Sequence, residues 1–125
     1  MEINKITELI IRCSIDVHRY LGQGLLESVY EEALCWELTK YNSNFQRQPL
    51  VSIKYNNINL SAGFRADLIV ENAVIVEIKS VEKLLPLHGK QLLTFLRLTD
   101  LRVGLLINFN TYVLKQGIER VINGF

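Results

Sequence analysis

The stretch that most constrains the fold is residues 66–79, ADLIVENAVIVEIK, which has the pattern of two strands joined by a tight turn. Side chains on a strand alternate between the two faces of a sheet, so residue parity decides which face each one occupies. The even-numbered positions are apolar, namely Leu68, Val70, Val74, Val76 and Ile78. Outside the turn residues 71–73, the odd-numbered positions include three charged residues, Asp67, Glu77 and Lys79. This alternation predicts an antiparallel hairpin with one core face and one face that carries charge.

The length of the turn decides whether the charged residues meet. Paired residues share a face when their numbers have an even sum, and a three-residue connection over 71–73 places Asp67 opposite Glu77. A two-residue turn at 72–73 would put these two carboxylates on opposite faces instead. Because opposed carboxylates repel, something should neutralise them, and a divalent cation together with Lys79 would do so. The alternative from the pattern alone is an ordinary salt-bridged, solvent-facing side of a sheet.

Composition limits the classes of protein that remain. The chain has 125 residues, of which 49% are hydrophobic, and this predicts one compact domain over residues 1–125. A net charge of +1 provides no global attraction for a polyanion, so any nucleic-acid surface must be a local patch. No apolar run is long enough to span a membrane, and no signal peptide is recognisable. Cys13 and Cys35 lack metal-ligand spacing and are interpreted as reduced core thiols, which suits a cytoplasmic protein.

The order of predicted elements is that of an α/β protein. Apolar residues at helical spacing predict three helices, at about 4–20, 26–40 and 87–98. The predicted strands outside the hairpin are 49–55 and 58–64, which flank Asn56-Asn57, then the continuous apolar run 103–109, and a final strand at YVLKQ, residues 112–116. The pattern leaves IERVI, residues 118–122, open between a strand and a short helix.

Several segments together resemble one known family. The segment GLLESVY contains Gly24, Glu27 and Tyr30 and matches the signature of the GxxExxY protein family. The resemblance continues, in order, through VHRYLGQG, RADLIVENAVIVEIKSVEKL, KQLLTFLRL and VGLLINFN, so it covers most of the chain. That family looks like a branch of the PD-(D/E)XK nuclease superfamily. The resemblance implies a mixed central β-sheet flanked by helices, with a restriction-endonuclease-like core.

The resemblance also implies roles for particular residues. Asp67 falls on the first acid of the superfamily motif, and Glu77-Ile78-Lys79 falls on the acid-x-Lys motif. Glu27 would be the acid on a helix, and Gln91 the glutamine of the following helix. Two positions depart from related exonuclease-like branches, since Gly63 lies four residues before Asp67 and Phe95 stands where a tyrosine is common. Phe95 lacks the tyrosine hydroxyl, so a contact made by that hydroxyl is in doubt, whereas the predicted metal site is unaffected.

These residue types suit phosphodiester hydrolysis. Carboxylate oxygens are the ligands that Mg²⁺ or Mn²⁺ prefers, so Asp67, Glu77 and Glu27 are the predicted metal ligands. Lys79 would orient the attacking water or stabilise developing negative charge. Gln91 would form a hydrogen bond with Lys79 or with the scissile phosphate. No set of His and Cys residues supports zinc, so a hard cation is favoured.

Three further residues are candidate accessory groups, and each has a structural alternative. Tyr30 shares a helix face with Glu27 at the i, i+3 spacing and could bind Glu27 or a phosphate oxygen, or only pack. His18 lies near the end of the first predicted helix and could act as a base, but a structural cap or buried partner is favoured, since an imidazolium is stabilised at a helix C-terminus. Arg65 could contact phosphate or remain a solvated surface residue.

The sequence thus favours a cytoplasmic, Mg²⁺- or Mn²⁺-dependent nuclease that acts on DNA, with RNA as the alternative substrate. The competing hypothesis comes from another class: a nucleic-acid-binding or assembly module that keeps the nuclease fold but cleaves weakly or not at all. A homodimer and a separate protein partner are both compatible with so small a chain, and a membrane partner is not expected.

Overall fold

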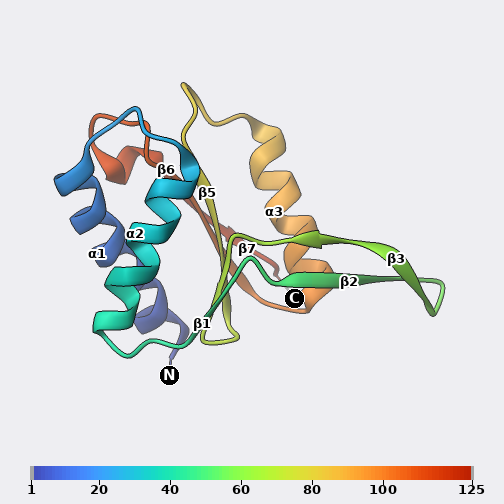
Figure 1. The fold of residues 1–125 in the computed structure, drawn as a ribbon. Coiled ribbons are helices and arrows are strands. Elements are labelled where there is room, and N and C mark those ends of the chain that lie inside the picture. The colour runs from blue at the N-terminus through green and yellow to red at the C-terminus, as the bar shows by residue number, and fades with distance from the viewer. Residues whose placement is uncertain (1, 125) are drawn as a thin grey trace.

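The computed structural model describes residues 2–124 and shows a mixed sheet covered by helices on both faces (Figure 1). The helices are α1 (Ile3–Leu21), α2 (Glu27–Lys40) and α3 (Pro86–Thr99). The strands of the sheet, in spatial order, are β1 (Phe45–Arg47), β4 (Leu68–Val70), β5 (Val74–Lys79), β6 (Val103–Asn108) and β7 (Ile118–Ile122). Only β5 and β6 run parallel, and the other neighbours are antiparallel. The predicted mixed sheet flanked by helices is therefore confirmed.

The hairpin formed by β4 and β5 has the predicted register. Leu68 pairs with Val76 and Val70 pairs with Val74, so residues 71–73 form a three-residue connection. Glu71 and Asn72 both have positive φ, at 54° and 51°, which the tight connection requires. Continuing this register beyond the strand end brings Asp67 opposite Glu77, as the parity argument predicts.

Two apolar clusters lie on the two faces of the sheet. The even-numbered residues of the hairpin pack with α1 and α2 in the larger cluster, which also contains Tyr30, Leu34 and Phe109. The odd-numbered Ile69 and Ile75 pack on the opposite face with Leu92 and Leu96 of α3. A strand whose two faces are both covered is apolar at nearly every position, as β6 is.

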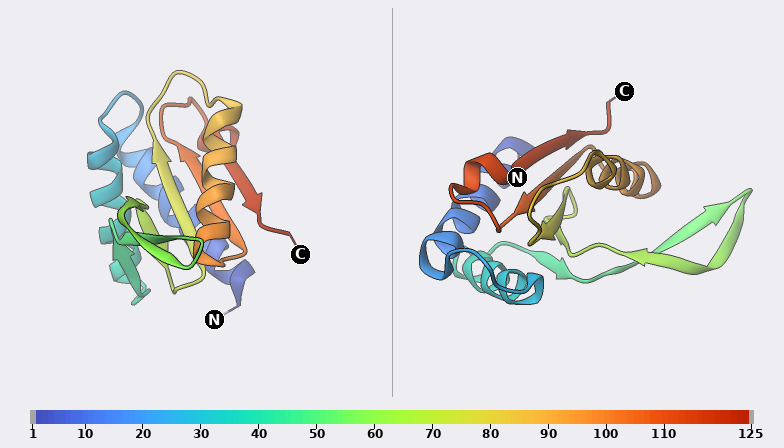
Figure 2. Two further views of the ribbon diagram at one scale, coloured as in Figure 1. Left: turned by 90° about the vertical axis from the view of Figure 1, so that its right-hand side faces the viewer. Right: turned by 90° about the horizontal axis from the view of Figure 1, so that it is seen from above.

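The strands β2 (Leu50–Tyr55) and β3 (Ile58–Arg65) form a separate two-stranded arm that projects away from the sheet (Figure 2). Its tip is the predicted Asn56-Asn57 turn, where φ is 49° and 64°, as in a type I′ turn. At the root of the arm, the ring of Phe64 stacks on that of Phe95 of α3 with the ring centroids 4.0 Å apart. The arm is thus held by its base, while its outer part is exposed.

The C-terminal region differs from the sequence-based expectation. The prediction of a strand at residues 112–116 is wrong, because the chain there turns and forms the short 3₁₀ helix η1 (Leu114–Gly117). The following IERVI segment is the strand β7, antiparallel to β6, with Ile118 paired to Ile107. Since β7 runs back along β6, the intervening residues have to reverse the chain and cannot extend. No helix within residues 2–124 has the length and apolar character needed to cross a membrane.

Candidate metal centre

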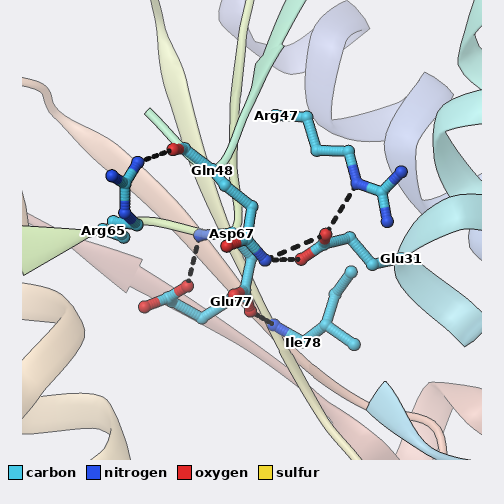
Figure 3. A network of polar contacts seen from close by, with 7 residues as sticks. All are labelled: Glu31, Arg47, Gln48, Arg65, Asp67, Glu77 and Ile78. Carbon is cyan, nitrogen blue, oxygen red and sulfur yellow. Dashed lines mark hydrogen bonds and ion pairs between the residues drawn. The ribbon is translucent and has the colours of Figure 1, made fainter. Parts of the chain in front are cut away.

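Asp67 and Glu77 are held together where β4 and β5 meet the root of the arm. One oxygen of Glu77, Oε2, accepts a hydrogen bond of 3.0 Å from the backbone N–H of Asp67. In return, Oδ2 of Asp67 accepts a hydrogen bond of 2.7 Å from the backbone N–H of Ile78 (Figure 3). Each carboxylate is therefore fixed by the backbone of the other strand, which leaves little freedom for the two groups to separate.

The environment of the pair disfavours two negative charges. Glu77 is only 9% exposed, and this burial, reinforced by the negative charge of Asp67, raises the pKa of Glu77 to about 8. Burial likewise raises the pKa of Asp67. Within residues 2–124 neither carboxylate forms an ion pair. The pair consequently retains a proton near neutral pH, which a bound cation would displace.

Lys79 lies two residues after Glu77 on β5 and is half-buried. Its positive charge lowers the pKa of both carboxyl groups, but this effect is smaller than that of burial. Its ammonium group has no hydrogen bond or ion pair with any of residues 2–124. The ammonium group of Lys79 therefore lies beside the carboxylate pair and is available to bind a ligand.

A third buried carboxylate, Glu31 of α2, was missed by the sequence reasoning. It accepts a 2.8 Å hydrogen bond from Nε of Arg47 and hydrogen bonds of 3.1 Å to both of its oxygens from Nε2 of Gln48. Its negative charge also raises the pKa of Asp67, so the two groups are near one another. In Figure 3, Asp67 lies between Glu31 and Glu77. One signal was present, because Glu31 follows Glu27 by four residues and so lies on the same helix face.

Gln48 connects this network to the root of the arm. Its backbone N–H donates to the carbonyl oxygen of Asp67 at 2.8 Å, and its own carbonyl oxygen accepts from Nη1 of Arg65 at 2.8 Å. Gln48 has a φ of 53°, a conformation that a non-glycine residue adopts only where its surroundings hold it. Neither Gln48 nor Arg47 belongs to a periodic pattern, and no sequence signal identified them.

Glu27 occupies a different place from the carboxylate pair. It is the first residue of α2, and its Oε2 accepts a 3.3 Å hydrogen bond from the backbone N–H of Ser80, just beyond β5. The hydroxyl of Ser80 donates to the carbonyl oxygen of Leu25 at 2.7 Å, so this contact pins the α1–α2 loop to the strand end. No three residues of the types His, Cys, Asp and Glu gather as a metal site within 2–124. The structure thus brings Asp67 and Glu77 together and leaves Glu27 apart.

The remaining candidates have contacts of their own. The Tyr30 hydroxyl donates to the carbonyl oxygen of Gly22 at 2.6 Å and accepts from the N–H of Leu25 at 3.1 Å, so it stabilises the α1–α2 loop instead of binding Glu27. Nε2 of His18 is 2.8 Å from the carbonyl oxygen of Thr111, which lies just after β6. Gln91 is exposed on α3, and its side chain forms no hydrogen bond with residues 2–124.

The two clustered carboxylates fit a hard divalent cation. Mg²⁺ is commonly held by one or two carboxylates and keeps several water molecules or substrate oxygens as its other ligands. Asp67 and Glu77 supply two such groups, already adjacent and without a compensating cation at ion-pair distance within residues 2–124. Their chemistry therefore suits Mg²⁺ or Mn²⁺ better than a soft metal.

One solved structure and one family model agree with this fold. An alkaline exonuclease from Laribacter hongkongensis superposes with a TM-score of 0.53 at 15% identity, covering 97% of this chain and 69% of the exonuclease. The crystal structure of SSO0001 matches with a TM-score of 0.47 at 19% identity, covering 96% of this chain and 79% of that protein. No curated protein sequence matches the chain. The model of the PD-(D/E)XK nuclease superfamily matches residues 4–121, nearly the whole sequence. The chain therefore belongs to the PD-(D/E)XK nuclease superfamily.

Proposed function

We propose that this chain hydrolyses phosphodiester bonds in DNA, with a divalent cation bound by Asp67 and Glu77. The observation that carries the proposal is the pair itself, two buried carboxylates held together without an ion-pair partner in the described chain. Burying such a pair costs stability unless a cation or a proton compensates it, so a purely structural role leaves it without a benefit. Membership of the nuclease superfamily supports the same reading.

Each group has a separate task in this proposal. When bound, Mg²⁺ or Mn²⁺ would polarise the scissile phosphate and help to activate water. The backbone hydrogen bonds at Asp67 and Ile78 keep the two carboxylates in position before the cation arrives. The ammonium group of Lys79, which forms no ion pair or hydrogen bond with residues 2–124, would donate to the phosphate oxygen on which negative charge develops.

The finer assignment within the superfamily is also a proposal. The segment GLLESVY supports the GxxExxY branch, and the exonuclease neighbour supports a nucleic-acid substrate. The alternative, a binding or assembly module with little cleavage, would use the same surface without turnover. Cleavage assays separate these two functions.

The experiment tests purified protein on linear, circular, branched and single-stranded DNA, and on RNA, with Mg²⁺, Mn²⁺ or EDTA. Cleavage of DNA that requires the added cation is expected. Asp67→Asn, Glu77→Gln and Lys79→Met are each expected to lower it at least about 100-fold. Glu71→Gln is the matched control, because it removes a carboxylate from the same hairpin outside the site.

A second readout is the melting temperature with and without Mn²⁺, since a ligand of the folded state raises it. Wild-type protein and Glu71→Gln should be stabilised by Mn²⁺, and the Asp67→Asn, Glu77→Gln double variant should not. An equal response in all three proteins would reject the metal site. Stabilisation by Mn²⁺ and binding of DNA, without cleavage of any substrate, would instead support the binding module.

A further inference from the structure

The outer face of α2 carries an apolar stripe that is largely exposed to solvent. Val29, Ala33 and Trp36 follow one another at intervals of four and three residues, so they lie along one side of α2, and the N-cap residue Leu26 precedes them. We call these four residues the outer stripe. The opposite side of α2 is apolar as well and is buried in the core through Tyr30, Leu34 and Leu38. A helix that is apolar on two sides is normally covered on both, whereas Trp36 is 64% exposed.

The outer stripe borders a groove of about 980 Å³ between α1 and α2. Val29, Ala33 and Trp36 line it from α2. Val17, Tyr20 and Leu21 line it from α1. Tyr20 is 90% exposed, so two large aromatic side chains stand at the groove in contact with water. None of Asp67, Glu77 and Lys79 lines the groove, which is therefore separate from the candidate metal centre.

The charged residues at the groove leave it acidic. Asp16, Glu32 and Glu37 contribute carboxylates from the two helices. The cations there are already engaged, because Lys40 pairs with Glu37 at 3.3 Å and lies over the ring of Trp36, and Arg47 pairs with Glu31. Within residues 2–124 neither Asp16 nor Glu32 forms an ion pair. The groove thus combines an apolar floor with unpaired negative charge at its edge.

We propose that this groove binds an amphipathic helix of a partner protein, one whose apolar stripe is flanked by Lys or Arg. Helices bind apolar grooves through side chains at i, i+3, i+4 and i+7, and complementary charge at the edge selects the partner. A second copy of this chain fits poorly, because a two-fold contact between two outer stripes would bring Glu32 and Glu37 close to their own equivalents. Nucleic acid is disfavoured by the same carboxylates.

Trp36 provides a direct signal for the test, because it is the only tryptophan in the chain. Three synthetic peptides of equal length would be titrated, one with a leucine stripe flanked by Lys, one with the same stripe flanked by Glu, and one with Lys but Ser in place of Leu. The first is expected to shift the Trp36 emission to the blue and to bind at least about tenfold more tightly than the second, a difference of about 1.4 kcal/mol. The third should not bind.

Variants then locate the site. Val29→Asp should weaken binding of the Lys-flanked peptide at least tenfold, and Glu32→Lys should reduce or reverse the preference over the Glu-flanked peptide. Leu87→Asp is the control, since Leu87 is an exposed apolar residue on α3 and its substitution should change nothing. Circular dichroism melts establish that each variant is folded.

Three results would overturn the proposal. The first is the absence of any emission change with the Lys-flanked peptide. The second is equal affinity for the Lys- and Glu-flanked peptides, which would remove the charge argument. The third is that sedimentation shows a dimer for the wild-type protein and a monomer for Val29→Asp. A second copy of the chain would then occupy the groove. Cleavage activity plays no part in these readouts, so the proposal stands or falls separately from the proposed nuclease function.

Discussion

Glu31 and Glu77 are both buried carboxylates near Asp67, but they are stabilised in different ways. Glu31 accepts hydrogen bonds from the guanidinium of Arg47 and the amide of Gln48, so its charge is compensated within the protein. Glu77 accepts one backbone hydrogen bond and faces the carboxyl group of Asp67. The protein thus supplies a cation for the Glu31 carboxylate, whereas under the proposed function a bound metal ion would compensate that of Glu77. A buried carboxylate without a compensating cation is therefore a stronger candidate for a functional acid than one that is paired with an arginine.

The largest expected effect is on stability at alkaline pH without metal. The unfolded chain ionises Glu77 near its ordinary pKa of 4.5, while the folded protein holds the proton until about pH 8. The folded state therefore binds more protons between these values, so the free energy of unfolding falls as pH rises through this window. Glu77→Gln removes this loss and should be more stable than wild type at pH 9 by a few kcal/mol, with little difference at pH 4.

Urea denaturation in EDTA at pH 4, 6 and 9 would measure this effect. Mn²⁺ at pH 9 should restore much of the lost stability to wild type and leave Glu77→Gln unchanged. Parallel pH profiles for the two proteins would show that the carboxyl of Glu77 is not held in its protonated form by the fold.

The next effect contrasts the two glutamates in cleavage. Glu77→Gln should lower kcat/KM at least about 100-fold, which corresponds to about 2.7 kcal/mol of transition-state stabilisation. Glu31→Gln keeps the shape and an oxygen acceptor for Gln48, and it should lower kcat/KM by less than about tenfold. Steady-state rates with a single oligonucleotide substrate would compare them. A larger loss of kcat/KM in Glu31→Gln would instead assign Glu31 to the catalytic site.

A smaller effect concerns the partner of Glu31. Arg47→Ala leaves a buried carboxylate with only Gln48 as its partner, and it should cost about 1–3 kcal/mol of stability, because Arg47 is partly exposed. Adding Glu31→Gln to this variant should recover part of the loss, since no unpaired charge remains. A double-mutant cycle from thermal or urea unfolding would give the coupling free energy. If the two free-energy changes simply add, the interaction between Arg47 and Glu31 contributes nothing to stability.

The smallest effect is expected for Glu27. Its carboxylate binds the N–H of Ser80 from an exposed position, and a glutamine oxygen can accept the same hydrogen bond. Glu27→Gln should therefore change stability by less than about 0.5 kcal/mol and cleavage by less than about tenfold. Melting curves and rates measured together would decide the question. A tenfold loss of cleavage or of Mn²⁺ affinity at unchanged stability would restore Glu27 as a metal ligand.

The central hairpin was predictable because strand geometry has a period of two. With the parity of the apolar residues and the odd length of the connection, the meeting of Asp67 and Glu77 followed from local pattern. The helices were equally accessible, since their apolar residues recur at helical spacing. The three helices begin and end within one or two residues of the predicted bounds.

The parts that could not be predicted depend on contacts between distant segments. The strand β1 has only three residues and exists because Phe45 and Arg47 pair with Val70 and Leu68. The same holds for the Glu31 network, which forms only when α2 packs beside β1. Such pairings have no periodic signature, because neither segment alone contains the pattern that creates them.

The position of the arm affects how insertions and deletions in the sequence would alter the fold. It leaves the sheet after Arg47 and returns at Leu68, and these two residues are paired neighbours in adjacent strands. Because the ends of the excursion are already together, closing it costs an entropy that grows only logarithmically, by about 0.6 kcal/mol for each doubling of its length. Insertions and deletions near the Asn56-Asn57 tip should therefore be tolerated without disturbing Asp67 or Gln48. The reach of the protein across a bound molecule can in this way vary almost independently of the stability of its sheet.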